Sequence, residues 1–367
     1  MDKNNIKKSI ICQFLKQEYE ICTSIIRQYQ PKSGDLAVFE VLELGKHPSI
    51  QGLNGNNTYI FPGDTIMMAF GNRYATEQFE GYIPRGYREE YHILGKGGAV
   101  GVVASMHYKM ELRGPTTLRL IGYVCDPTTG AVLNTKKLAG KLLPFNPDKP
   151  RPYRTILSLG TGMDSGKTTT AGYLARGLML ANQTVAYIKL TGTVYTKDRS
   201  FVRDCGAKCA VDFSSVGFPS TYMTKPTELL NLYETLLQKV DEEAQPDFVI
   251  IEIADGLLQR ETTFLLKNKD FQKTIDHIAL SSVDSMGILQ GIQWLRKNIK
   301  RYPDFLSGLF TAAPLLIKEA KRHTRIPILT LEALSHPSVL DILNRHKAKH
   351  NGHLTAKQKE PQSTRVW

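Results

Sequence analysis

Ten consecutive residues have the types and spacing of a loop that binds phosphate: Gly160, Thr161, Gly162, Met163, Asp164, Ser165, Gly166, Lys167, Thr168 and Thr169. An apolar run over 155–159 precedes this loop, and a helical pattern over 168–180 follows it. In such a strand–loop–helix unit, successive backbone N–H groups point inward around an anion, and the helix N-terminus adds partial positive charge. We expect Lys167 to reach the β- and γ-phosphates of a nucleotide, and Thr168 to offer its hydroxyl to Mg²⁺.

The loop departs from the strict pattern at one position. That pattern has glycine five residues before Gly166, where this chain has Thr161, and the nearby glycines are Gly160 and Gly162. The alternative interpretation is a glycine-rich turn between a strand and a helix, with an ordinary surface lysine. The strand, the Gly-Lys-Thr sequence and the helix occur together, which favours the phosphate loop (P-loop).

Acidic residues lie at the end of a second apolar run, over 247–256, and could supply a metal ligand. In P-loop proteins, the strand beside the loop strand ends in a carboxylate that holds Mg²⁺ directly or through water. Glu252 or Asp255 could do this, because ligands of open α/β sheets gather at the carboxyl ends of central strands. Asp255 could instead cap the N-terminus of a helix.

Two further charged positions follow the helix of the loop. Lys189 ends the next predicted strand, where a lysine faces either substrate and phosphate or solvent. Asp198 opens a short helical run over 199–205, either as a metal ligand or as an N-cap, and Asp204 is a lesser metal-ligand candidate one turn later. The residues alone leave both alternatives open.

The elements that must position these side chains alternate along the second half of the chain. Predicted strands cover 155–159, 185–190, 209–213, 248–253, 277–282, 308–312 and 326–331, and predicted helices include 226–240, 288–300 and 314–323. Apolar strands with intervening helices predict a parallel sheet covered on both faces, and hence an α/β fold.

The first half has a different period. Short strands predicted over 36–42, 58–61, 65–70, 100–108 and 118–124 are separated by Gly/Pro turns, which is typical of a small β-rich barrel or sandwich. The predicted parts are an N-terminal amphipathic helix (1–30), the β-rich domain (31–142), a proline-rich linker (143–152), the P-loop domain (153–343) and a basic disordered tail (344–367).

Composition excludes several classes of protein. The 367 residues are 41% hydrophobic and 22% charged, no apolar run approaches the ~20 residues of a membrane span, and the N-terminus does not resemble a secretory signal. Five scattered cysteines indicate reduced thiols and a cytoplasmic location. The net charge of +12 is partly due to the tail, but no basic–aromatic module accompanies it, so we expect neither a nucleic-acid nor a membrane partner.

With these residues in place, the C-terminal domain resembles P-loop NTPases of the dethiobiotin-synthetase-like type over about residues 153–335. That family has Gly-Thr-Asp-Thr-x-x-Gly-Lys-Thr as its loop, and the Gly-Thr at 160–161 and Gly-Lys-Thr at 166–168 keep its spacing. In the family the next strand ends in a substrate-binding lysine, which Lys189 matches. Glu252 matches the family's strand-end glutamate, and Asp255 replaces a glycine.

The domain is also similar to a P-loop family associated with D-glutamate N-acylation, which shares the Gly-Thr-Asp loop and a Thr-Gly motif after the second strand. The first 150 residues have no counterpart in dethiobiotin synthetase. The family's adenine-reading asparagine has no evident match in 308–313, which leaves ATP versus GTP open.

The resemblance implies a Mg-ATP-binding enzyme of ligase type that activates a small carboxylic or amino acid by phosphoryl transfer. Lys167, Lys189 and Glu252 would act in catalysis, and Thr168, Glu252 and Asp198 would hold Mg²⁺. The alternative is a nucleotide-dependent switch or adaptor that hydrolyses NTP slowly and acts on a protein partner. Lys189 favours the enzyme, and the unexplained N-terminal domain favours the switch. The sequence leaves open whether the protein forms a homo-oligomer.

Overall fold

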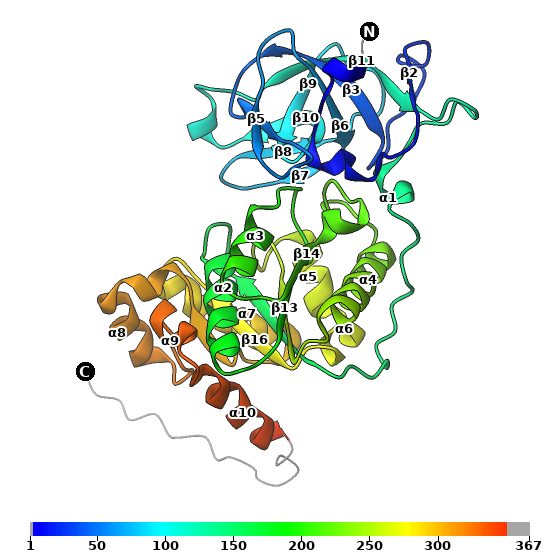
Figure 1. The fold of residues 1–367 in the computed structure, drawn as a ribbon. Coiled ribbons are helices and arrows are strands. Elements are labelled where there is room, and N and C mark those ends of the chain that lie inside the picture. Colours follow the sequence, from blue (N-terminus) through cyan, green and yellow to red (C-terminus); the bar gives the residue numbers. More distant parts are fainter. Residues whose placement is uncertain (1–2, 351–367) are drawn as a thin grey trace.

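The computed structural model describes residues 3–350, in which a six-stranded parallel sheet carries the P-loop (Figure 1). The strand order is β14-β13-β15-β12-β16-β17, and every neighbouring pair is parallel. The strands are β12 (Arg154–Gly160), β13 (Val185–Lys189), β14 (Cys209–Asp212), β15 (Phe248–Glu252), β16 (His277–Ser281) and β17 (Phe305–Ser307). The strand that ends in Glu252 therefore lies directly beside the strand that leads into the P-loop.

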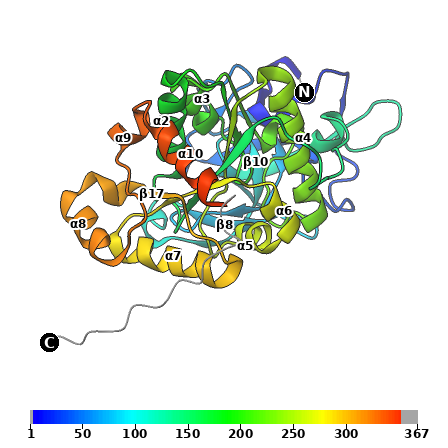
Figure 2. The ribbon, with the colours of Figure 1, turned by 90° about the horizontal axis from the view of Figure 1, so that it is seen from below.

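Helices cover both faces of this sheet, as the sequence predicts (Figure 2). One face is covered by α2 (Lys167–Leu180), α3 (Lys197–Asp204), α9 (Leu331–Ser335) and α10 (Val339–His350). The other is covered by α4 (Pro226–Ala244), α5 (Arg260–Lys267), α6 (Lys269–Lys273) and α7 (Ser285–Ile299), with α8 (Pro314–His323) beside α7. Successive strand residues alternate between the two cores: Ile156 packs in the first and Leu157 in the second.

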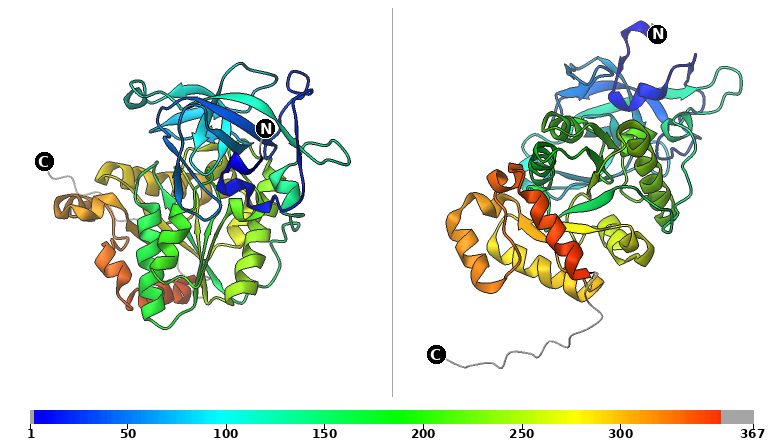
Figure 3. Two further views of the ribbon diagram at one scale, coloured as in Figure 1. Left: turned by 45° about the horizontal axis from the view of Figure 1, so that its top comes forward. Right: turned by 60° about the horizontal axis from the view of Figure 1, so that its bottom comes forward.

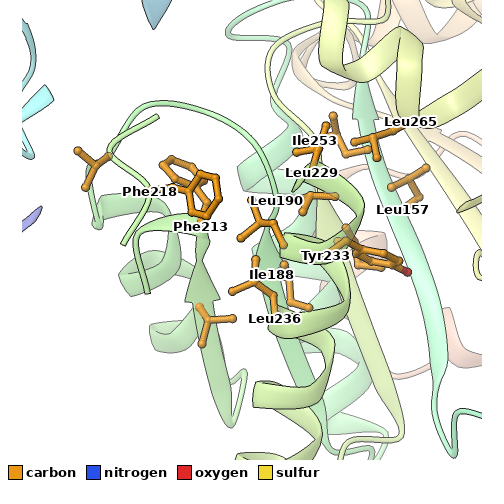
Figure 4. Packing of buried hydrophobic residues seen from close by; sticks show 14 of the residues in the cluster. Leu157, Ile188, Leu190, Phe213, Phe218, Leu229, Tyr233, Leu236, Ile253 and Leu265 are labelled. Atoms are coloured by element: carbon orange, nitrogen blue, oxygen red, sulfur yellow. The ribbon is translucent and has the colours of Figure 1, made fainter. Parts of the chain in front are cut away.

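The core on the α4 face, part of which Figure 4 shows, also includes buried residues of the N-terminal part, such as Ile6 and Leu36. Ile188 and Leu190 face Leu236 and Leu229 of α4, and all four side chains are buried. Burying a large apolar side chain stabilises a fold by about 1.5–3 kcal/mol, so this contact fixes the strand that carries Lys189.

Most of residues 3–125 form a β-rich part in which β3, β6, β9, β10 and β11 close into a barrel, because β6 pairs both with β3 and with β10. Its strands are β1 (Lys7–Lys8), β2 (Glu20–Cys22), β3 (Leu36–Glu43), β4 (Ser49–Gln51), β5 (Asn57–Tyr59), β6 (Thr65–Phe70), β7 (Arg73–Tyr74), β8 (Phe79–Tyr82), β9 (Tyr91–Gly95), β10 (Ala99–Met106) and β11 (Thr117–Cys125). The five predicted strands correspond to β3, β5, β6, β10 and β11, and the barrel is one of the two predicted architectures.

The predicted amphipathic helix over 1–30 is wrong. Residues in this stretch form short 3₁₀ helices, η1 (Lys3–Asn5) and η2 (Ile10–Phe14), together with β1 and β2. The backbone is used by neighbouring strands: Ser9 N donates to Met67 O (3.1 Å) and Ile11 N donates to Gly97 O (3.2 Å). Long-range pairing therefore outweighs the helical spacing of the apolar side chains.

Two predicted strands of the α/β part are also wrong. Residues 308–312 contain the 3₁₀ helix η5 (Leu309–Ala312), and β17 ends just before them, because Gly308 has a φ of 105° that interrupts the strand. Residues 326–331 contribute only an isolated bridge between Ile328 and Leu306. Pro327 has no N–H to donate to a ladder, which is consistent with this short pairing.

The connector and the tail also differ from their predictions. The proline-rich stretch 143–152 packs against α4. Phe145 N donates to Asn231 Oδ1 (2.9 Å), and Arg151 pairs with Glu234 (2.8 Å); Asn231 and Glu234 both belong to α4. The predicted disordered tail begins inside α10, whose helix reaches His350, and 351–367 lie outside the described residues. Within residues 3–350, no helix is both long enough and apolar enough to cross a bilayer.

The β-rich part lies over the carboxyl end of the parallel sheet, where the P-loop is (Figure 3). The turn between β9 and β10 meets the segment after β13, where Gly97 N donates to Val194 O (3.1 Å). Gln51 Nε2 donates to Thr196 Oγ1 (2.6 Å), and Thr135 of the short helix α1 (Thr135–Leu138) donates to Gly217 O (2.6 Å). The two parts are therefore joined through specific backbone and side-chain hydrogen bonds.

This close approach predicts that Gly97→Ala destabilises the protein. A Cβ at residue 97 would lie 2.2 Å from Val194 O, a backbone atom that cannot turn away. We expect a loss of about 1–3 kcal/mol in the free energy of unfolding, measured by urea denaturation. Gly86→Ala is the matched control, because a Cβ there meets nothing within 4 Å. Equal stability of the two variants would contradict this packing.

Candidate functional site

The P-loop connects β12 to α2, and Lys167 folds back over it. Lys167 Nζ donates to Gly162 O (2.7 Å) and lies 3.4 Å from Ser165 Oγ. A Cβ at Gly160 would lie 2.1 Å from that same hydroxyl, so the turn requires glycine there. Desolvation lowers the pKa of Lys167, while the carboxylates of Glu252 and Asp255 oppose this effect. The ten predicted residues thus form the expected strand–loop–helix unit.

Glu252 is the buried centre of the site, with 1% of its side chain exposed. Its Oε1 accepts a hydrogen bond from Thr168 Oγ1 (3.0 Å), and its Oε2 accepts one from Tyr187 OH (2.7 Å). The phenol belongs to β13, two residues before Lys189 and therefore on the same face of that strand. Sequence reasoning missed Tyr187, although this period-two relation to Lys189 was a usable signal.

Lys189 joins two acidic side chains at the end of β13. It forms a close ion pair with Asp198 of α3 and lies 3.6 Å from Glu252 Oε1. Burial alone would lower its pKa, but Glu252 and Asp198 together outweigh burial and raise the pKa of Lys189, so the ammonium stays charged. Lys189 therefore lines the cavity beside the P-loop and is not exposed at the strand end.

The structure places the remaining acidic candidates clearly. The N-cap position of α3 is Thr196, so Asp198 is not the cap, and Asp204 is exposed at the far end of that helix. Asp255 does not cap a helix either, because Gln259 caps α5. Desolvation raises the pKa of Asp255, which Lys167, Lys189 and Arg73 partly offset.

A cavity of about 480 Å³ opens beside the P-loop and is lined by Thr168, Lys189, Asp198, Glu252 and Asp255. Its oxygen ligands are of the hard type that Mg²⁺ prefers. Within residues 3–350, no group of three or more His, Cys, Asp or Glu side chains could hold a metal ion by itself. The donors present therefore fit a Mg²⁺ ion that nucleotide phosphates also coordinate, as P-loop sites require.

A more apolar cavity of about 310 Å³ begins at the N-terminus of α2. Its lining includes Thr169, Leu309, Thr311, Leu331 and Glu332, and Leu309 is 52% exposed. An apolar surface with a few polar groups suits a flat heteroaromatic ring, and this cavity shares Gly166 with the P-loop.

A third cavity, of about 360 Å³, lies between the β-rich part and the parallel sheet. The β-rich part contributes Lys46, His47, Arg73 and Lys96, which sequence reasoning missed because they come from turns and from the short strand β7. The sheet side contributes Lys189 together with Asp198 and Asp255, which also line the P-loop cavity. The two cavities therefore share Lys189, Asp198 and Asp255.

His47 is neutral in this cationic setting. Its side chain is buried, with a residue exposure of 4%, and desolvation, together with Arg73, Lys96 and Lys46, lowers its pKa to about 3. Arg73 is also desolvated, which lowers its pKa to about 10, while Asp255 acts in the opposite direction.

Comparisons with known proteins show similarity of fold alone. No protein-family model matches the chain, and no curated protein matches it. Among solved structures, the signal recognition particle receptor FtsY from Elizabethkingia anophelis is 17% identical, with a TM-score of 0.35, over 54% of this chain and 66% of that one. A DUF1611 family protein from Anabaena variabilis is 14% identical, with a TM-score of 0.39, over 56% and 62%.

The 54 kDa signal recognition particle protein from Aeropyrum pernix, solved in complex with GDP, is 18% identical, with a TM-score of 0.32, over 59% of this chain and 54% of that one. The chain thus spans less than two thirds of each of these three proteins.

The environment of His47 predicts a pH dependence of stability. Because its folded pKa of about 3 lies below the ordinary value of 6.5, the unfolded state binds a proton that the folded state excludes as pH falls below 6.5. Between pH 7 and pH 5 this costs about 2 kcal/mol of unfolding free energy. His47→Gln should remove that contribution in urea titrations at the two pH values. The exposed-site variant His336→Gln should retain it, and equal pH dependence in His47→Gln and the wild type would refute the assignment.

Proposed function

We propose that this protein is an ATP-dependent, ligase-type enzyme that transfers the γ-phosphoryl group of Mg-ATP to a small carboxylic or amino acid. The observation that carries the proposal is the position of Lys189, which lines both the P-loop cavity and the cavity beneath the β-rich part. A charged lysine between a nucleotide site and a second cavity suits the transfer of a phosphoryl group to an anionic acceptor. A switch that only hydrolyses nucleotide has no need of it.

The P-loop cavity would hold the triphosphate. Backbone N–H groups of 160–169 and Lys167 would surround the β- and γ-phosphates, and the apolar cavity near Leu309 would hold the base. Thr168 and Glu252 would hold Mg²⁺, with Asp198 as a further ligand. When bound, the metal neutralises charge on the phosphate oxygens.

The reaction would proceed in two balanced steps. A carboxylate oxygen of the acid attacks the γ-phosphorus, the bond from that phosphorus to the bridging oxygen breaks, and ADP leaves with the electron pair. An amine then attacks the carbonyl carbon of the acyl phosphate, inorganic phosphate leaves, and the amine proton passes to solvent. Lys189 would align the acid and, with Lys167, neutralise the charge that is transferred.

The first test is turnover of Mg-ATP by the full chain, alone and with a pool of small carboxylic and amino acids. We expect acids to stimulate ADP formation, and Lys167→Ala to reduce that rate by at least about a hundredfold, because the γ-phosphate loses its cation. Lys297→Ala, an exposed lysine on α7, is the control. Tight ATP binding with slow, acid-independent hydrolysis would instead support the switch. Replacing ATP by GTP in the same assay tests the base.

A second variant separates acid binding from nucleotide binding. Lys189→Met should raise KM for the stimulating acid about tenfold or more and lower kcat, since the acid loses its cation in both the ground and the transition state. Lys137→Met, at an exposed lysine beside the interface, should behave as the wild type. Unchanged acid kinetics in Lys189→Met would remove the observation on which the proposal depends.

A further inference from the structure

The cavity beneath the β-rich part carries more positive charge than the proposed reaction uses. Phosphoryl transfer to an acid requires one cation beside the acceptor carboxylate, and Lys189 occupies that position. Lys46, Arg73 and Lys96 line the same cavity from the opposite side. Among residues 3–350, none of these three forms an ion pair with a carboxylate within 4 Å.

Arg73 in particular lines the cavity without a carboxylate of the described residues within ion-pair distance. One of its terminal nitrogens donates to Leu94 O and the other to Gln78 Oε1 (2.8 Å), so neutral groups hold the guanidinium in place. Arg73 Nε and the neighbouring His47 Nδ1 are buried and lack a hydrogen-bond partner within the described part of the chain. Buried charges and buried polar atoms without partners destabilise a folded protein, so a bound anion is the natural complement.

The size of the cavity limits the size of the molecule that carries this anionic group. About 360 Å³ lies at the lower end of the range for sites that enclose small molecules, so a compact molecule has to reach from Lys189 to Arg73. Asp255 lines the wall near both cations and helps to keep them charged. A planar guanidinium binds carboxylate and phosphate-type oxygens in a bidentate manner. Arg73 therefore suits an anionic group at the end of the molecule that lies away from Lys189.

We propose that the β-rich part supplies a second anion subsite, centred on Arg73 and assisted by Lys46 and Lys96. The acid substrate accordingly carries two anionic groups: one carboxylate that is activated beside Lys189 and a second carboxylate or phosphate-type group held by Arg73. This inference rests on the proposed function, because it assumes that one carboxylate of the acid is activated beside Lys189. It assigns to the β-rich part the selection of the acid.

The experiment compares acids that differ only in the second charge. ADP formation by the full chain, with hydroxylamine present as the amine that consumes the acyl phosphate, is measured with butyrate against succinate, pentanoate against glutarate and hexanoate against adipate, and with 3-phosphonopropionate as the phosphate-type arm. We expect at least about a tenfold higher kcat/KM for the doubly charged member of the best pair. A preference for 3-phosphonopropionate over the dicarboxylates would assign the subsite to a phosphate-type group.

Variants test whether Arg73 causes this preference. Arg73→Met should bring the doubly and singly charged acids of a pair to within about threefold of each other, Arg73→Lys should restore part of the difference, and Lys96→Met should weaken it less. Arg113→Met, at an exposed arginine of the β-rich part, should keep the full preference. Melting temperatures check that each variant is folded. A purely structural role for Arg73 would change both acids equally and leave their ratio intact.

The outcomes distinguish the two proposals. If acids stimulate turnover but single and double charges are equivalent, or the ratio survives Arg73→Met, the subsite is overturned and the proposed function stands. If no acid stimulates turnover, but calorimetry shows a dicarboxylate or 3-phosphonopropionate binding to the wild type and not to Arg73→Met, the subsite stands and the proposed reaction fails. Neither turnover nor binding would overturn both.

Discussion

The buried carboxylate of Glu252 is the interaction on which the arrangement of the site depends. A carboxylate with 1% of its side chain exposed is costly unless its oxygens accept hydrogen bonds or face cations. Thr168 and Tyr187 supply those hydrogen bonds, and Lys189 lies 3.6 Å away. Because these partners come from α2 and β13, one carboxylate at the end of β15 fixes the first turn of the P-loop helix against the strand that carries Lys189.

The second constraint is the contact between the β-rich part and the carboxyl end of the parallel sheet. The segment between β13 and α3 makes this contact: Val194 O accepts from Gly97 N, and Thr196 bonds to Gln51. The same segment leads directly to Asp198, the partner of Lys189. An open edge of a parallel sheet is thereby converted into a cavity with walls from both parts, in which charges are screened less than at a free surface.

The sequence could predict the local features of the site and not those created by docking. The P-loop and the strand-end Glu252 can be predicted because contiguous residues on a strand, a loop and a helix form a recognisable sequence pattern. Tyr187 resembles a core residue of a buried strand, so its hydroxyl contact was not foreseen. Lys46, His47, Arg73 and Lys96 reach the site only through tertiary contacts between distant segments. The helix predicted over 1–30 failed for the same reason, because its backbone pairs with Met67 and Gly97.

The two cavities differ in the balance of charge among the residues that line them. At the P-loop cavity the positive charge of Lys167 and Lys189 is opposed by the carboxylates of Glu252, Asp198 and Asp255. Beneath the β-rich part, Lys46, Arg73, Lys96 and Lys189 line the cavity against Asp198 and Asp255, so the cations outnumber the carboxylates there. An anion that enters this cavity therefore gains most from the β-rich part. The segment that follows β13 leads from Lys189 to Asp198, which pairs back with Lys189, and Thr196, two residues before Asp198, bonds to Gln51 of the β-rich part. The contact with the β-rich part and the ion pair of Lys189 are therefore fixed by the same short stretch of backbone.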